Sequence, residues 1–146
     1  MKFEGVFEVG APIEKVFAIM TDPDQVARCL PDLQKLEVRS PVEFDAVVKA
    51  GVSFVRGDFA VHFKTVEKTP PTRVRLTAHG TGLGSAVDME IAAEMSRSGG
   101  GTSMKWRVDA LVSGKIASLG QRVIEAQAQK IIERLFVCLR ERLGSP

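Results

Sequence analysis

The sequence has few of the residues from which nucleic-acid sites and catalytic sites are usually built. Its 146 residues include no Tyr, one Trp, two His and two Cys. Binding of single-stranded nucleic acid relies on aromatic side chains that stack on bases, and nucleic-acid binding in general relies on a basic face. The formal net charge here is only +2. We therefore expect no nucleic-acid partner.

Long hydrophobic runs are also absent. No stretch reaches the roughly 18 apolar residues that a transmembrane helix requires, and residues 1–5 lack the apolar core of a signal peptide. We expect a cytoplasmic protein without a transmembrane segment. Cys29 and Cys138 lie far apart in the sequence and outside any CxxC motif. In a reducing compartment we expect both to be free thiols that act as small hydrophobic residues.

The residues that are present suit one folded domain over 1–146. Hydrophobic residues make up 45% of the chain and charged residues 26%, which is an ordinary composition for a globular protein. A domain of this size buries roughly 68–70% of the surface of its unfolded chain. It therefore needs neither a disulfide nor a metal to fold.

Apolar and polar residues alternate over much of the chain. In residues 2–9 the alternation places Phe3, Phe7 and Val9 on one face, which is typical of a strand with one buried side. Similar segments follow one another from about residue 33 to residue 112, separated by Gly- and Pro-rich turns. Strands that are short and consecutive predict an antiparallel meander, because parallel strands need long crossovers.

Helical periodicity appears at two places. Residues 12–20 and 23–29 predict two short helices after the first strand, and residues 115–143 predict a helix about 43 Å long, which Gly144 and Pro146 end. Only this long helix is large enough to cover the apolar face of the sheet. The predicted fold class is α+β, with a curved antiparallel sheet of about seven strands wrapped around a long C-terminal helix. We place an apolar pocket between them, near the two short helices.

The chain offers little for catalysis. His62 and His79 fall on the charged faces of their strands, so both should point to solvent. No set of His, Cys and Asp residues has metal-ligand spacing, and no phosphate-binding loop or nucleophile elbow occurs. The Gly-rich stretch 80–84 lies between two strands and does not open a helix, so we interpret it as a hairpin connection or as a gate at a pocket mouth. We expect no catalytic residue, no metal and no cofactor.

The residues predicted to face inward are the informative ones. They are apolar, and they include Met89, Met95 and Met104, whose side chains adapt to irregular apolar partners. Two interpretations remain open at this point. The inward side chains either fill a dry core or leave an apolar cavity.

Motifs near both ends of the chain are typical of a known family. Near the start they are Gly5, Phe7, Ala11-Pro12, Glu14, Val16-Phe17, Asp22-Pro23, Cys29 and Leu30-Pro31. Near the end they are Gly101-Thr102, Trp106, Asp109, Val112, Gly114-Lys115, Ala117, Leu119-Gly120, Arg122 and Lys130. On these residues the chain resembles the carbon monoxide dehydrogenase G-subunit family, within the START-like or polyketide-cyclase-like (SRPBCC) superfamily. The resemblance covers nearly the whole chain.

The resemblance implies a β-α-α-β6-α helix-grip fold with a deep hydrophobic cavity. It also implies association with molybdenum hydroxylases of the carbon monoxide dehydrogenase type. Members of that family are proposed to recruit the enzyme to the membrane or to carry a quinone-like lipid, and they are not themselves oxidoreductases.

Two departures from the family pattern qualify what the resemblance implies. A Gly usually follows the Cys-x-Pro element, whereas Asp32 stands here and could put a carboxylate near the pocket entrance. Many members carry a Pro/Ala-rich tail with an amphipathic anchor, whereas this sequence stops at Pro146. We therefore do not expect membrane tethering.

The leading hypothesis is a non-enzymatic carrier of a hydrophobic small molecule, a lipid or quinone-like compound, that serves a molybdenum hydroxylase. The expected ligand-binding residues are Met20, Cys29, Leu30, Val55, Phe59, Leu76, Met89, Met104, Trp106, Leu119, Val123 and Gln127. Gln127 is the polar group on the helix face that could orient a ligand carbonyl. One alternative is an enzyme of the cyclase or hydratase type that uses Asp32 or Cys29. Another is an assembly module with a vestigial pocket.

Overall fold

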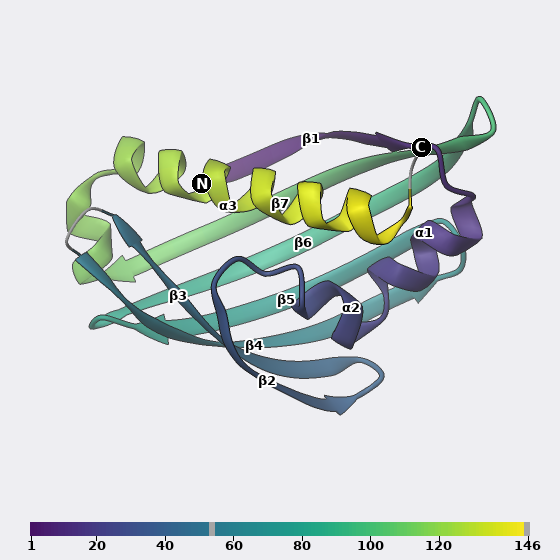
Figure 1. Cartoon of the computed structure of the whole chain (residues 1–146). Helices are drawn as coiled ribbons and strands as arrows, with labels where there is room; N and C mark the ends of the chain where they lie inside the picture. The colour runs from purple at the N-terminus through teal and green to yellow at the C-terminus, as the bar shows by residue number, and fades with distance from the viewer. Residues whose placement is uncertain (53–54, 145–146) are drawn as a thin grey trace.

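Seven antiparallel strands form one curved sheet, and a long C-terminal helix lies across one face of it (Figure 1). The computed structural model describes residues 1–52 and 55–144. Its strands are β1 (Lys2–Val9), β2 (Leu33–Ser40), β3 (Glu43–Val52), β4 (Val55–Thr69), β5 (Arg73–Gly82), β6 (Ser85–Ser98) and β7 (Gly101–Gly114). Its helices are α1 (Ile13–Met20), α2 (Pro23–Ala27), the 3₁₀-helix η1 (Lys115–Leu119) and α3 (Gln121–Arg142).

The strand order is β1-β7-β6-β5-β4-β3-β2, so β2 to β7 form a meander and β1 pairs with β7. In that last pair Lys2 lies opposite Asp109 and Val9 lies opposite Thr102. Phe7 and Val9 are buried, as the alternation predicts. The predicted α+β architecture, with about seven strands and two short helices after the first, is confirmed.

The closed core lies at the end of the sheet that α1 and α2 cover. One cluster joins the sheet to α1 and the C-terminal end of α3; its buried members are Phe7, Val9, Ala11, Ile13, Val16, Phe17, Val74, Ala93, Met95, Met104 and Leu143. A second joins β3, β4 and β5 to α2; its buried members are Ala27, Phe44, Ala46, Phe63 and Ala78. Both clusters lie near the short helices, where the sequence predicts the apolar space, and partly buried Leu30, Leu33 and Leu36 border the second cluster.

The long helix begins later than predicted. Residues 115–119 form the 3₁₀-helix η1, and Gly120 then adopts a φ of +93°, in a region that L side chains rarely enter. A continuous α-helix cannot pass through that conformation, so α3 starts at Gln121. Gly144, with a φ of +63°, follows the helix end as predicted. Pro146 lies outside the described residues.

The prediction of two free cysteines is also wrong. Cys29 and Cys138 form a disulfide, with 5.4 Å between their Cα atoms and 109 residues between them in the sequence. Because α3 runs back across the sheet, its C-terminal half reaches the loop that follows α2. Sequence separation alone therefore did not reveal the pairing.

Candidate functional site

The inner face of the sheet, toward α3, is only partly closed at the end next to η1. Apolar side chains there are half-buried, in contrast to the core at the α1 end. On β6 and β7 they are Val87, Met89, Ile91, Val108, Ala110 and Val112. On α3 the half-buried apolar side chains are Ile124, Ala128, Ile131, Ile132 and Leu135. We call these two sets together the inner apolar end.

Aromatic packing fixes the C-terminal half of α3 to the sheet. The ring of Phe136 stacks on Phe7 at a centroid distance of 4.8 Å and meets Trp106 at 5.2 Å. Gly5 makes room for the indole, because a Cβ at that position would lie 2.8 Å from Trp106 Cζ2. Leu139, one turn further along the helix, is fully buried.

The loop after α2 holds the same half of the helix. Cys29 is bonded to Cys138, and Arg134 Nη1 donates a hydrogen bond of 3.2 Å to Asp32 Oδ2. Arg56 of β4 lies 3.8 Å from that carboxylate. The hydrogen bond and charge of Arg134, helped by Arg56, lower the pKa of Asp32 below its ordinary value. Asp32 is thus an ionised link between α3 and the rest of the fold.

The N-terminal half of α3 has no such ties. Across the described ranges 1–52 and 55–144, no hydrogen bond, ion pair or disulfide joins residues 121–133 to the sheet. Gln121 bonds instead to Glu125 within the helix. Within the described ranges, the hydrogen bonds, ion pair and disulfide that join α3 to the rest of the fold therefore come from residues 134–142.

The twelve predicted ligand-binding residues do not all gather at one place. Three are buried: Cys29, Phe59 and Met104. Eight are half-buried: Met20, Leu30, Val55, Leu76, Met89, Trp106, Leu119 and Gln127. Val123 is 38% exposed.

Their positions separate into two ends of the sheet. Met20 packs against the core at the α1 end, and Leu30 packs against the core under α2. Leu119 and Gln127 lie at the opposite end, on η1 and α3. Met89 packs against the same cluster as Leu30 and also belongs to the inner apolar end, so only part of the predicted set shares one location.

Several α3 residues that face the sheet were not among those predicted. A helix beginning at Gly120 would have given the right phase, because Ile124, Ala128, Ile131 and Leu135 recur at helical spacing from there. A helix that runs from residue 115 shares Ile131 and Leu135 with this pattern but places Val123, not Ile124, on the inner face. The Gly at position 120 was the available signal.

The hairpin between β5 and β6 borders the inner apolar end. Leu83 and Gly84 at its tip have φ values of +52° and +69°, which suits a tight two-residue turn. The Leu83 side chain lies over Gly57 of β4, where a Cβ would come within 2.5 Å of Leu83 Cδ2. Residues 80–82 belong to β5, so the predicted hairpin connection is confirmed for Leu83 and Gly84 alone.

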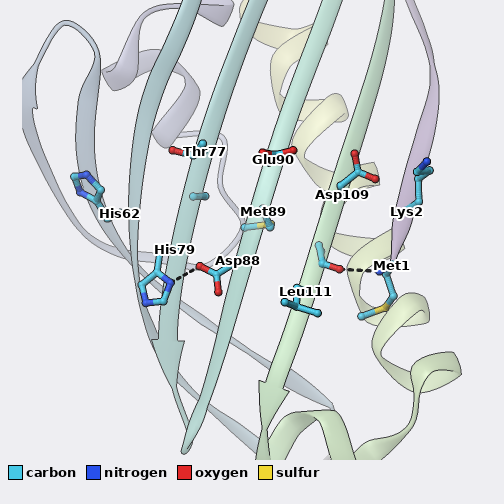
Figure 2. Close-up of a pocket in the computed structure, with 12 residues that line it drawn as sticks. Met1, Lys2, His62, Thr77, His79, Asp88, Met89, Glu90, Asp109 and Leu111 are labelled. Atoms are coloured by element: carbon cyan, nitrogen blue, oxygen red, sulfur yellow. Dashed lines mark hydrogen bonds and ion pairs between the residues drawn. The ribbon is translucent and has the colours of Figure 1, made fainter.

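A separate hollow of about 760 Å³ lies on the outer face, away from α3. Figure 2 shows His79, Asp88, Glu90 and Asp109 on the strands that line it, with α3 behind the sheet. Because it lies on the side of the sheet away from α3, it is not the pocket that the sequence predicts between the sheet and the helix.

Both histidines lie on this outer face, as predicted. His79 Nδ1 is 2.6 Å from Asp88 Oδ1, and His62 Nδ1 is 2.6 Å from Asp45 Oδ1. The hydrogen bond with His62 is the main cause that lowers the pKa of Asp45, and Arg39 adds to it. The side chains of His62 and His79 are 44% and 58% exposed, so neither is held in a cleft that excludes water.

A smaller hollow of about 540 Å³ lies beside the junction of α1 and α2. Thr21, Asp22, Arg39, Ser40 and Lys68 contribute polar groups to its lining. Ala18, Pro23, Val38 and Pro41 line it as well.

The described residues supply neither a metal centre nor a membrane-spanning helix. Within residues 1–52 and 55–144, no group of three or more His, Cys, Asp or Glu residues is placed to hold a metal ion. None of the helices in those ranges combines the length and apolar character needed to span a membrane.

Comparison with solved structures shows the fold. A conserved protein from Geobacillus kaustophilus has a TM-score of 0.90 at 22% identity, over 99% of this chain and 95% of that one. A START superfamily protein from Mycobacterium smegmatis has a TM-score of 0.74 at 12% identity, over 98% and 97%. Ara h 8.0201 has a TM-score of 0.68 at 17% identity, also over 98% and 97%. The helix-grip fold of START-like proteins is thus confirmed.

Sequence comparison identifies the family. No curated protein sequence matches the chain. The family model for the G subunit of carbon monoxide dehydrogenase (CoxG) matches residues 5–144. This match covers nearly the whole chain and agrees with the fold. The chain therefore belongs to the CoxG family of carbon monoxide dehydrogenase subunits.

Proposed function

We propose that this protein binds a hydrophobic small molecule, a lipid or quinone-like compound, between α3 and the inner face of the sheet. It acts in the cytoplasm as a non-enzymatic accessory protein of a carbon monoxide dehydrogenase-type molybdenum hydroxylase. The observation that carries the proposal is the inner apolar end. Facing apolar side chains of β6, β7 and α3 remain half-buried there, while the α1 end of the same layer is closed.

Apolar surface left partly open to water is a source of binding energy. Covering it contributes about 25 cal/mol per Å², before the cost of ordering the ligand and the helix. Large exposed apolar patches on soluble proteins usually mark binding sites. Binding in this position would therefore come mainly from apolar burial, with the half-buried Gln127 as the polar group that orients a ligand carbonyl.

The N-terminal half of α3 gives a ligand a route of entry. Residues 121–133 are held to the sheet by apolar packing alone within the described part of the chain. Displacing this segment breaks no hydrogen bond to the sheet. Entry between α3 and β7 therefore costs less than entry beside Phe136, where three rings pack together.

The two residues considered for an enzyme of the cyclase or hydratase type are poorly suited to catalysis. Asp32 is paired with Arg134, and its lowered pKa keeps it ionised, so it is a poor proton donor near neutral pH. Cys29 is bonded to Cys138 and has no free thiolate in this state. These observations favour binding over turnover. The family description supports the link to carbon monoxide dehydrogenase.

Native mass spectrometry of the purified protein, followed by organic extraction, tests the proposal. We expect a stoichiometric lipid or quinone, or stoichiometric uptake when decylubiquinone and palmitate are offered to the ligand-free protein. A ligand-free mass and no uptake of either compound would contradict binding and would favour the assembly module. Co-purification of a molybdenum hydroxylase with the tagged chain tests the partner separately.

A further inference from the structure

The two halves of α3 are attached to the fold in different ways. Cys138 and Arg134, one helical turn apart, are both joined to the short loop after α2, through Cys29 and Asp32. Residues 121–133 have only apolar packing against the sheet. The loop after α2 therefore controls how firmly the whole helix is held over the inner apolar end.

The disulfide is the strongest of these attachments. Arg134 is 59% exposed and Asp32 is 41% exposed in their ion pair, and exposed pairs contribute little and weaken further in salt. The cross-link closes a loop of 109 residues, so it restricts the opened chain strongly. Without it, α3 would be held by the packing of Phe136 and its apolar neighbours, with exposed hydrogen bonds of Arg140 and Arg142 near the helix end.

The location of the disulfide permits exchange with external thiols. Cys29 is 3% exposed, whereas Cys138 is half-buried on the helix. A thiolate can therefore approach more easily from the Cys138 side. In reducing compartments, disulfides are usually transient and redox-sensing rather than structural.

We propose that Cys29 and Cys138 form a redox-controlled clasp on α3. The disulfide holds the helix over the inner apolar end and retains the ligand, and reduction by a dithiol frees the helix to open. The retained ligand rests on the proposed function, whereas the effect on the helix does not.

Reduction of the Cys29–Cys138 bond proceeds by thiol–disulfide exchange. A thiolate of the dithiol attacks Cys138 Sγ, forms a mixed disulfide and releases Cys29 as a thiolate that takes up a proton. The second thiol of the reductant then displaces Cys138. The two cysteines gain two electrons and two protons, and the dithiol becomes a disulfide.

Hydrogen–deuterium exchange of the full chain, oxidised and after treatment with dithiothreitol, tests the effect on the helix. We expect the amides of residues 121–135 to exchange about tenfold faster or more after reduction, while β6 and β7 remain protected. Cys138→Ser should match the reduced wild type and should not respond to dithiothreitol. Cys138 is the better position to replace, because Cys29 lies in the core.

Release of Nile red into excess lipid vesicles tests the effect on the ligand in the same samples. Release should be faster from the reduced wild type and from Cys138→Ser than from the oxidised wild type, by a similar factor. If Nile red binds but neither release nor α3 exchange depends on reduction, the clasp is wrong and the binding function stands. If no form binds Nile red while α3 exchange still depends on reduction, the clasp stands and the binding function is wrong. A purified chain with two free thiols that oxidised glutathione cannot join would also overturn the clasp.

Discussion

At the scale of single residues, Gly5 contributes to packing because it lacks a side chain. It leaves the space that the Trp106 indole occupies, and the indole in turn meets Phe136 of α3. One missing Cβ on β1 thus helps to position the C-terminal half of the long helix.

Gly5→Ala should therefore destabilise the protein by about 1–3 kcal/mol, because the new Cβ would lie 2.8 Å from Trp106 Cζ2 and force the ring to move. Urea unfolding followed by the fluorescence of the one Trp measures the free energy of unfolding. Val6→Ala, at a 58% exposed position on the same strand, is the control and should change stability by less than about 0.5 kcal/mol. Equal stability of Gly5→Ala and the wild type would refute the packing role.

Asp32 provides a prediction about pH. Its folded-state pKa is lowered by Arg134, so the stabilisation is present above the ordinary pKa of an aspartate and is lost as the pH falls through the lowered value. Asp32→Asn should be less stable than the wild type at neutral pH, and the difference should vanish in acid. Asn tolerates the φ of +55° at this position, so backbone strain does not confound the comparison.

Thermal unfolding of both proteins between about pH 2 and pH 7 measures this difference. Arg134→Gln should reproduce the effect of Asp32→Asn, and added salt should reduce both effects. A stability difference that persists unchanged in acid would show that the ion pair is not its cause.

The sequence predicts the orientation of single side chains correctly where the pattern depends on neighbouring residues. Strand alternation placed Phe7 inward and His79 outward, because each depends only on near neighbours. It failed for Cys29 and Cys138, whose bond depends on how a helix 109 residues downstream crosses the sheet.

At the scale of elements, Gly120 decides where the long helix begins. Its φ of +93° separates η1 from α3 and sets the helical phase that turns Ile124, not Val123, toward the sheet. The strands could be predicted because each carries its own alternation. The helix start could not, since a single Gly within a helical pattern is compatible with either a continuous helix or a break.

Gly120→Ala should cost about 1–2 kcal/mol through backbone strain alone, because no atom lies within 4 Å of the added Cβ. Thermal unfolding monitored by circular dichroism measures the loss. Gln129→Ala, at an exposed position inside α3, is the control and should be nearly neutral. An unchanged or raised stability of Gly120→Ala would indicate that residues 115–142 can form one helix.

At the scale of the whole molecule, the apolar side chains between the sheet and α3 are buried at the α1 end and only half-buried at the end next to η1. The sequence predicted the layer and its apolar character. It could not predict which end is open, because closure depends on where α1, α2 and Phe136 pack in three dimensions. The predicted pocket was consequently placed at the closed end, and Met104, 1% exposed, is core and not an open surface.

Charged substitutions at the inner apolar end should abolish retention of a hydrophobic ligand while the fold persists. Met89→Asp on β6 and Ile124→Asp on α3 each put a carboxylate among half-buried apolar side chains. Leu111→Asp is the control, since Leu111 is 70% exposed on the outer face. Nile red binding, measured together with circular dichroism, should be lost in the first two variants and kept in the third. Loss in Leu111→Asp alone would move the site to the outer hollow.

The most direct test of a ligand site between α3 and the sheet is to map where decylubiquinone protects the backbone, by hydrogen–deuterium exchange of the oxidised chain. We predict slower exchange in residues 87–91, 108–112 and 121–135, which form the inner apolar end, and no change in β2. Protection confined to other segments, or none at saturating decylubiquinone, would contradict a site in this position.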